Sequence, residues 1–111
     1  MDAPPNDELW FDLGPREALE PRLPLRVCVD GRPVGLYLWQ QKIYALEDEC
    51  PHASARLSAG TVHADGWVEC PLHGWRYHVS DGNGFWDWQG SVRAYELREH
   101  DGSVWLARPG R

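Results

Sequence analysis

Two short segments of the chain carry residue types that bind transition metals. The segment ECPHAS contains Cys50 and His52, and the segment ECPLHGW contains Cys70 and His73. Together they offer two thiolates and two imidazoles. Four such donors complete either a tetrahedral zinc site or a [2Fe-2S] cluster with two ligands on each iron. The two segments therefore predict a metal centre, and the donor types alone leave both kinds of centre open.

The order of the donors favours a binuclear centre. A structural zinc site usually takes a Cys-x-x-Cys pair from one segment and a pair of histidines from another. Here each segment mixes a cysteine with a histidine, so each can give its sulfur to one metal and its nitrogen to the other. Gly74 follows His73 and permits the close backbone approach that lets amides donate hydrogen bonds to cluster sulfides. Zinc remains the weaker alternative.

Composition limits the classes of protein that come into question. The chain has 111 residues, which suit one small domain, and 42% of them are hydrophobic, which is enough for a core. A net charge of -6 argues against nucleic-acid binding, which needs a surplus of lysine and arginine. No apolar run is long enough to cross a membrane, and the first residues do not resemble a secretory signal. We therefore expect a cytoplasmic protein.

The remaining cysteine, histidines and acidic residues are expected to be structural. Three cysteines without a secretory signal argue against a disulfide framework, and Cys28, within LRVCVD, is expected to be a small buried side chain. The acidic residues are interpreted as solvated surface, with a docking patch as the alternative for the run Glu47, Asp48 and Glu49, which adjoins the first segment. The histidines outside the two segments are expected at the surface or hydrogen-bonded rather than as ligands; they are His63, His78 and His100.

The elements that must position the two segments are strands. Short alternating or β-branched runs separated by turn dipeptides predict an all-β domain. The expected strands are 9–13, 25–29, 34–40, 42–48, 61–64, 67–70, 76–79, 84–88, 92–99 and 103–107. Asp-Gly dipeptides at 30–31, 65–66 and 101–102 predict hairpin turns, and 14–24 is expected to be a loop with one helical turn at 16–19. On this map both metal-binding segments lie in loops at strand ends.

At these residues the chain resembles the Rieske iron–sulfur family, whose signature is C-x-H followed by C-x-x-H. ALEDECPHASARLSAGTV resembles the first loop of that family, with Leu57, Ser58 and Gly60 at the positions of an L-S-x-G motif. VECPLHGWRY resembles the second loop, and VRAYELREHDGSVWL resembles the closing hairpin. The resemblance implies a small antiparallel β-sandwich with a cluster-binding subdomain formed by two loops, at about 49–60 and 69–75, within a single domain over 1–111.

The same resemblance implies a Rieske [2Fe-2S] cluster with Cys50 and Cys70 on the inner iron. His52 and His73 would bind the outer, more exposed iron, where electrons enter and leave. High-potential members carry an extra cysteine in each loop and a serine after the second His-Gly, where this chain has Trp75. The low end of the range of potentials, which is roughly -150 to +300 mV, is therefore expected.

The implied function is that of a soluble electron carrier without a substrate site of its own. It would pass one electron from a reductase to a terminal oxygenase, or to another redox protein, by transient docking. HGWRY is also similar to the Rieske domains of oxygenases, so a small subunit of a larger oxidoreductase remains an alternative. That subunit would be of the nitrite reductase type or a separately encoded Rieske half of an oxygenase. A zinc-binding structural module is the less favoured third interpretation.

The tryptophans near the second segment admit two interpretations. Trp86 and Trp88 lie two positions apart, so they are expected to form one core face of a strand, with shielding of the cluster or contact with a partner as the alternative. Trp75, beside His73, is expected to pack around the metal centre.

Overall fold

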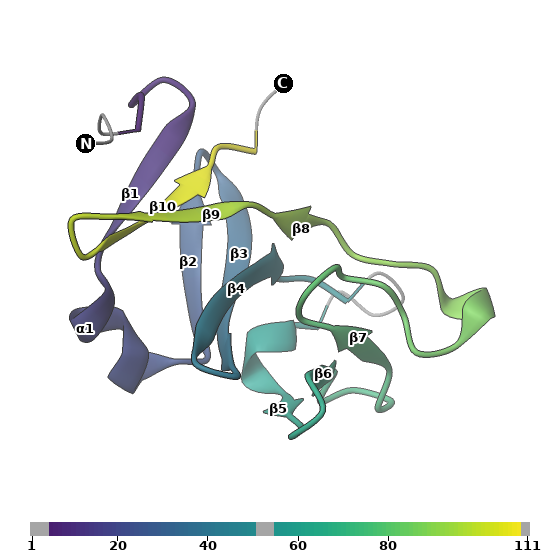
Figure 1. The fold of residues 1–111 in the computed structure, drawn as a ribbon. Coiled ribbons are helices and arrows are strands. Elements are labelled where there is room, and N and C mark those ends of the chain that lie inside the picture. The colour runs from purple at the N-terminus through teal and green to yellow at the C-terminus, as the bar shows by residue number, and fades with distance from the viewer. Residues whose placement is uncertain (1–4, 51–54, 110–111) are drawn as a thin grey trace.

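In the part of the chain that the structure describes, all the paired strands run antiparallel, in three small sheets. The computed structural model describes residues 5–50 and 55–109. Its sheets have the strand orders β1-β10-β9, β2-β3-β4-β8 and β5-β6-β7 (Figure 1). In chain order the elements are β1 (Trp10–Pro15), α1 (Arg16–Leu19), η1 (Glu20–Arg22), β2 (Leu25–Val29), β3 (Arg32–Trp39), β4 (Lys42–Glu47), η2 (Leu57–Ala59), β5 (Thr61–Val62), β6 (Trp67–Glu69), β7 (Arg76–His78), η3 (Asp87–Gln89), β8 (Ala94–Tyr95), β9 (Leu97–His100) and β10 (Ser103–Ala107). The predicted all-β antiparallel class is confirmed.

Tight turns and one short helix join these strands where the sequence predicts them. Asp30 and Gly31 have φ of 53° and 80°, and the Asp101-Gly102 pair has φ of 51° and 80°. Positive φ at both central residues is the geometry of the two-residue hairpin turn that follows the natural twist of the strands. The helical turn α1 has four residues. Within the described part of the chain, no helix is long and apolar enough to cross a membrane.

The central sheet, β2-β3-β4-β8, is buried on both faces. Along β3, Val34 and Leu36 belong to one core and Tyr37 belongs to the other. Along β4, Ala45 and Leu46 are divided in the same way. Because successive side chains of a strand point to opposite faces, a strand covered on both sides needs apolar residues at consecutive positions. This explains the uninterrupted apolar run VGLYLW in β3.

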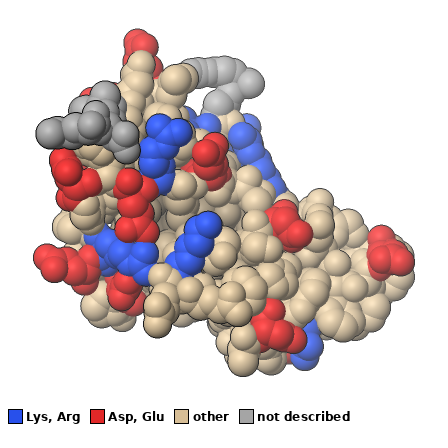
Figure 2. Space-filling view, viewed as in Figure 1, with Lys and Arg blue, Asp and Glu red and all other residues tan. Residues whose placement is uncertain are grey.

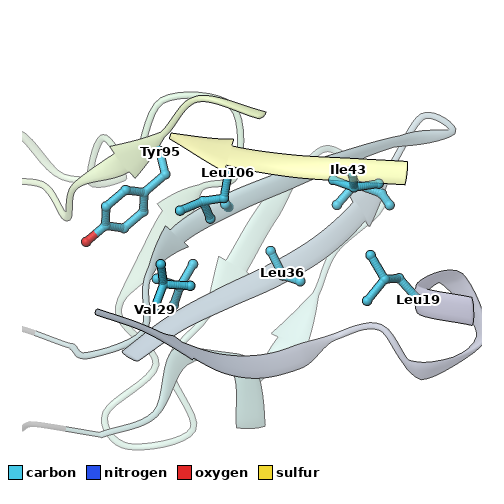
Figure 3. Close-up of a cluster of buried hydrophobic side chains, with 9 residues drawn as sticks. Leu19, Val29, Leu36, Ile43, Tyr95 and Leu106 are labelled. Carbon is cyan, nitrogen blue, oxygen red and sulfur yellow. The ribbon is translucent and has the colours of Figure 1, made fainter. Parts of the chain in front are cut away.

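The first core lies between the central sheet and the sheet β1-β10-β9. Figure 3 shows its side chains converging from both sheets and from α1. Its buried members are Leu19, Val29, Val34, Leu36, Ile43, Ala45, Tyr95, Val104 and Leu106. This core contains none of the predicted metal ligands, so it acts as the scaffold on which the other half of the molecule is built.

The second core joins the opposite face of the central sheet to the sheet β5-β6-β7. It includes the two cysteines of the metal-binding segments among its apolar side chains. Its buried members are Tyr37, Leu46, Cys50, Leu57, Val68, Cys70, Tyr77, Val79 and Val92. The segments that could bind a metal are therefore anchored by their cysteines inside a packed core.

The predicted burial of Cys28 is wrong. Cys28 is exposed, as is Arg26, whereas Val29 is completely buried. The period of two along β2 places Cys28 on the same outward face as Arg26. The charged Arg26, two positions away, is the signal in the sequence that indicates an exposed Cys28.

The strand predicted at 84–88 is also wrong, and so is the core interpretation of its tryptophans. Two isolated bridges, Tyr77 to Gly84 and Asn83 to Ser91, take the place of a strand there, and the chain then forms η3. Trp86 is 40% exposed and Trp88 is 68% exposed. The cause is a backbone reversal in which the N–H of Gly84 donates to the carbonyl of Gly90 at 2.9 Å.

Truncation of a central core residue should destabilise the protein far more than truncation of its neighbour on the same strand. Leu36 is fully buried, so Leu36→Ala should lower the free energy of unfolding by about 2–5 kcal/mol, as large-to-small core changes do. Leu38, two positions along β3, is exposed, and Leu38→Ala should change it by less than about 0.5 kcal/mol. Thermal unfolding followed by circular dichroism compares the two variants. Equal losses of stability would contradict the difference in burial between Leu36 and Leu38.

Candidate metal centre

The two cysteines begin loops that are closed in the same way. Cys50 follows β4, and Cys70 follows β6. The backbone N–H of Cys50 donates to the carbonyl of Ala55 at 2.8 Å, and that of Cys70 donates to the carbonyl of Trp75 at 2.7 Å. Each loop thus returns to its starting cysteine after five residues. Both cysteine side chains are buried, which places their sulfurs inside the second core.

The sulfurs of Cys50 and Cys70 interact with each other in this buried position. The pKa of Cys70 is raised to about 11. Burial is the largest cause, the backbone N–H of Leu72 acts to lower the pKa, and the adjacent Cys50 adds to the rise. Two thiols side by side in apolar surroundings resist ionisation unless a cation compensates their charge. A coordinated metal ion provides that compensation and deprotonates the thiols it binds. The pair therefore fits the sulfur half of a metal centre.

His73 lies on the exposed side of the second loop. It has φ of 74°, and Gly74 has φ of 71°, so two consecutive residues adopt the left-handed conformation. Such a φ is uncommon for a residue other than glycine and clusters at functional sites. The double reversal leaves His73 exposed although Cys70, three positions earlier, is buried. His52, the fourth predicted ligand, lies outside the described residues.

The structure thus brings two of the predicted ligands into contact and places a third at the adjacent surface. Among residues 5–50 and 55–109, no three His, Cys, Asp or Glu side chains form a group that could hold one metal ion. The other histidines have protein partners, as expected. His63 Nε2 lies 2.8 Å from Glu69 Oε1, His78 Nε2 lies 3.0 Å from the carbonyl of Asp65, and His100 Nε2 lies 3.4 Å from Asp101 Oδ2.

Tyr77 contacts the sulfur pair and was not among the residues that the sequence singled out. Its hydroxyl lies 3.8 Å from the Sγ of Cys50, and the side chain is fully buried. Burial is the main cause that raises the pKa of Tyr77, and the neighbouring Cys50 adds to it. The hydroxyl therefore keeps its proton and can donate a hydrogen bond to the Cys50 sulfur. The inward position of Tyr77 within the alternating run RYHV is the signal that could have found it.

The L-S-x-G motif has a structural reason at each of its positions. Leu57 is buried in the second core. Ser58 donates to the carboxylate of Asp48 twice, from its backbone N–H at 2.7 Å and from its hydroxyl at 2.6 Å. Gly60 packs so closely that a Cβ atom there would lie 1.9 Å from the carbonyl oxygen of Glu69. The interpretation of Asp48 as solvated surface is wrong, because its side chain is fully buried.

An exposed aromatic surface adjoins the second loop. It consists of Leu72, Phe85, Trp86 and Trp88, all exposed, and Trp88 meets the half-buried Trp75 with ring centroids 5.1 Å apart. The side of the molecule that carries β5–β7 and the loop after them shows fewer charges than the side with β1, β9 and β10 (Figure 2). This aromatic surface leaves shielding of the centre or contact with a partner as the roles open to Trp86 and Trp88.

The sequence is similar to proteins of known function. The chain is 34% identical over 77 residues to ferredoxin CarAc of Metapseudomonas resinovorans. The match covers 68% of this chain and 71% of that protein. It is 36% identical over 72 residues to pheophorbide a oxygenase of Arabidopsis thaliana, covering 61% of this chain but only 13% of that protein.

The fold is likewise that of a solved ferredoxin. The ferredoxin of carbazole 1,9a-dioxygenase from Nocardioides aromaticivorans IC177 superposes with a TM-score of 0.81 and 29% sequence identity, over 90% of this chain and 98% of that one. The family described as the Rieske [2Fe-2S] domain matches residues 9–96, a range that includes both loops and the buried sulfur pair. The chain therefore belongs to the Rieske [2Fe-2S] family, and its cofactor is a Rieske [2Fe-2S] cluster.

Proposed function

We propose that this protein is a soluble electron carrier that passes one electron from a reductase to a terminal oxygenase. The observation that carries the proposal is the buried pair of sulfurs, Cys50 and Cys70, beside the exposed His73. The similarity to ferredoxin CarAc and to the ferredoxin of carbazole 1,9a-dioxygenase supports this role over others. When bound, the cluster supplies reversible one-electron chemistry.

The residues of the chain bind the cluster, exclude water from it and expose one ligand to a partner. Cys50 and Cys70 would hold one iron in the interior, and His52 and His73 would hold the other. The second core excludes water from the two sulfurs, and Tyr77 supplies a hydrogen-bond donor there. The reversed backbone at His73 presents this ligand to the surface, which shortens the path to a docked protein.

The proposal includes three points on the whole protein. We propose that the chain is one domain over 1–111, that it works in the cytoplasm, and that it has no substrate site of its own. Docking would be transient, as is typical of electron-transfer partners, whose interfaces are small. A subunit of a larger oxidoreductase would instead copurify in fixed stoichiometry with its partner, so purification of the native protein distinguishes the two roles.

Substitution of a proposed ligand should abolish the cluster, whereas substitution of the exposed cysteine should not. Cys50→Ser and His73→Ala should remove the electron paramagnetic resonance (EPR) signal of the dithionite-reduced protein, because each deletes one donor of the set. Cys28→Ser is the matched control and should keep the signal, since Cys28 is exposed on β2. Iron and sulfide analysis gives the same comparison. An unchanged spectrum in either ligand variant would refute the assignment.

Removal of the Tyr77 hydroxyl should lower the reduction potential. A hydrogen bond to a sulfur of the cluster stabilises the reduced, more negative state, so Tyr77→Phe should make reduction harder. A hydrogen bond is worth about 1 kcal/mol and a factor of ten equals about 59 mV for one electron, so the expected shift is tens of millivolts. Tyr95→Phe is the control, because Tyr95 lies in the first core. A redox titration followed by EPR measures both, and equal potentials would exclude the role of Tyr77.

A further inference from the structure

A fully buried carboxylate lies two positions before Cys50. The side chain of Asp48 has no exposed surface, although the neighbouring Glu49 is exposed. Burial of a charged carboxylate is costly unless hydrogen bonds and an opposite charge compensate it. A fold that needed only to fill this space could use an apolar or amide side chain. The presence of a buried negative charge two positions before Cys50 calls for a functional explanation.

The hydrogen bonds of Asp48 close the first loop from both ends. Its backbone N–H donates to the carbonyl of Pro33 on β3 at 3.1 Å, which fixes Asp48 to the central sheet. Its two carboxylate oxygens accept the backbone N–H and the hydroxyl of Ser58, at 2.7 and 2.6 Å. Cys50 therefore lies between two anchored positions, 48 and 58. This arrangement restrains where the Cys50 sulfur can move.

The charge of Asp48 is only partly compensated. Arg26 Nη1 lies 3.6 Å from Asp48 Oδ2, and the Arg26 side chain is about one-third exposed to solvent, at 34%. Both Ser58 groups donate to the carboxylate, so its oxygens act as acceptors, as an ionised group does. In a poorly hydrated interior such a charge acts over longer distances than it would in water.

The field of Asp48 extends to the region of the sulfurs. Tyr37 is fully buried, and within the described residues its hydroxyl has no hydrogen-bond partner. Burial is the main cause that raises the pKa of Tyr37, followed by the charges of Asp48 and Cys70. The charges of the Asp48 carboxylate and of the Cys70 sulfur thus both act on the buried hydroxyl of Tyr37. Successive Cα atoms lie about 3.8 Å apart, so the Cα atoms of Asp48 and Cys50 are at most about 7.6 Å apart.

We propose that Asp48 is a positioning residue that holds the first loop through Ser58 and lowers the reduction potential through its buried negative charge. The inference rests on the proposed function, since it requires a cluster at Cys50 and Cys70. Reduction adds an electron to the cluster, and a nearby negative charge opposes that addition. Arg26 acts in the opposite direction, but less strongly because it is partly solvated.

The test is a redox titration of the cluster-loaded protein, followed by EPR, on charge variants of matched shape. Asp48→Asn keeps an acceptor for the Ser58 N–H and removes the charge, so the equilibrium constant for reduction should rise roughly tenfold, which is about 59 mV for one electron. Glu49→Gln makes the same change in charge at the adjacent exposed position and should shift the potential by a small fraction of that, because solvent screens it. A Glu49 shift as large as that of Asp48, or no shift in Asp48→Asn, would overturn the proposal.

A variant that removes a positive charge near Asp48 tests the effect of charge without changing Asp48 itself. Arg26→Gln removes the compensating cation and should lower the potential, by less than the rise in Asp48→Asn. An unchanged potential in Arg26→Gln would show that charges at this pair of residues do not act on the cluster. If Asp48→Asn fails to retain its cluster, the Arg26→Gln result decides alone, and an unchanged potential there would refute the inference. Absence of a Rieske EPR signal in the unaltered protein would instead refute the proposed function.

Discussion

Two buried sulfurs held side by side are the constraint on which this structure depends. Without a cation between them, Cys50 and Cys70 form a pair of thiols that resist ionisation, and the pKa of Cys70 is raised to about 11, chiefly by burial and further by Cys50. A fold tolerates such a pair only if other packing holds it in place. The central sheet provides that packing because it is buried on both faces: one face builds a scaffold core without ligands, and the other builds the core that contains the sulfurs. The redox site is thus continuous with the hydrophobic interior.

The polar groups around the sulfur pair act in opposing directions on its charge. The Tyr77 hydroxyl and the Leu72 N–H stabilise negative charge on sulfur, whereas the carboxylate of Asp48 opposes it. Potentials in this family depend on such hydrogen bonds, charges and exposure rather than on the ligands alone. The expectation of a low potential, drawn from Trp75 at the serine position, stays a prediction. The buried charge of Asp48 is an independent reason for the same direction.

The sequence predicted the strands best at hairpins that turn at an Asp-Gly dipeptide, although the strand expected at 92–99 is divided into β8 and β9. β2 and β10 were predicted to the residue, because their alternation and their turns agree. The turn between β3 and β4 was not specified, since its positive-φ residues are Gln40 and Gln41, which carry no turn signal. The loop with Trp86 and Trp88 was misread because the alternation of GFWDW resembles a strand. Its actual course is set by contacts distant in sequence, which a local pattern does not contain.

Burial at the site was the hardest property to predict, because it depends on which face another element covers. Asp48 belongs to an acidic run and looked like surface, yet η2 brings Ser58 over it and completes its hydrogen bonds. The placement of His52 and its role as a ligand stay predictions, since it lies outside the described residues. The prediction of the ligands, by contrast, rested on the chemistry of the donors and needed no knowledge of packing, and it stays a prediction.

The exposed aromatic surface is consistent with the proposed exchange of electrons at the histidine side. Side chains such as Trp88 would normally be buried, and a flexible loop could turn them inward. This loop cannot do so easily, because Gln89 is itself buried and donates from Nε2 to the carbonyl of Arg76 at 2.6 Å. Anchoring the loop through a polar residue keeps its tryptophans outside. Rigid aromatic groups lose little entropy on binding and contribute strongly at interfaces. Partner contact near His73 would then depend on apolar packing as well as on charge, and would be less sensitive to salt than a purely electrostatic interface.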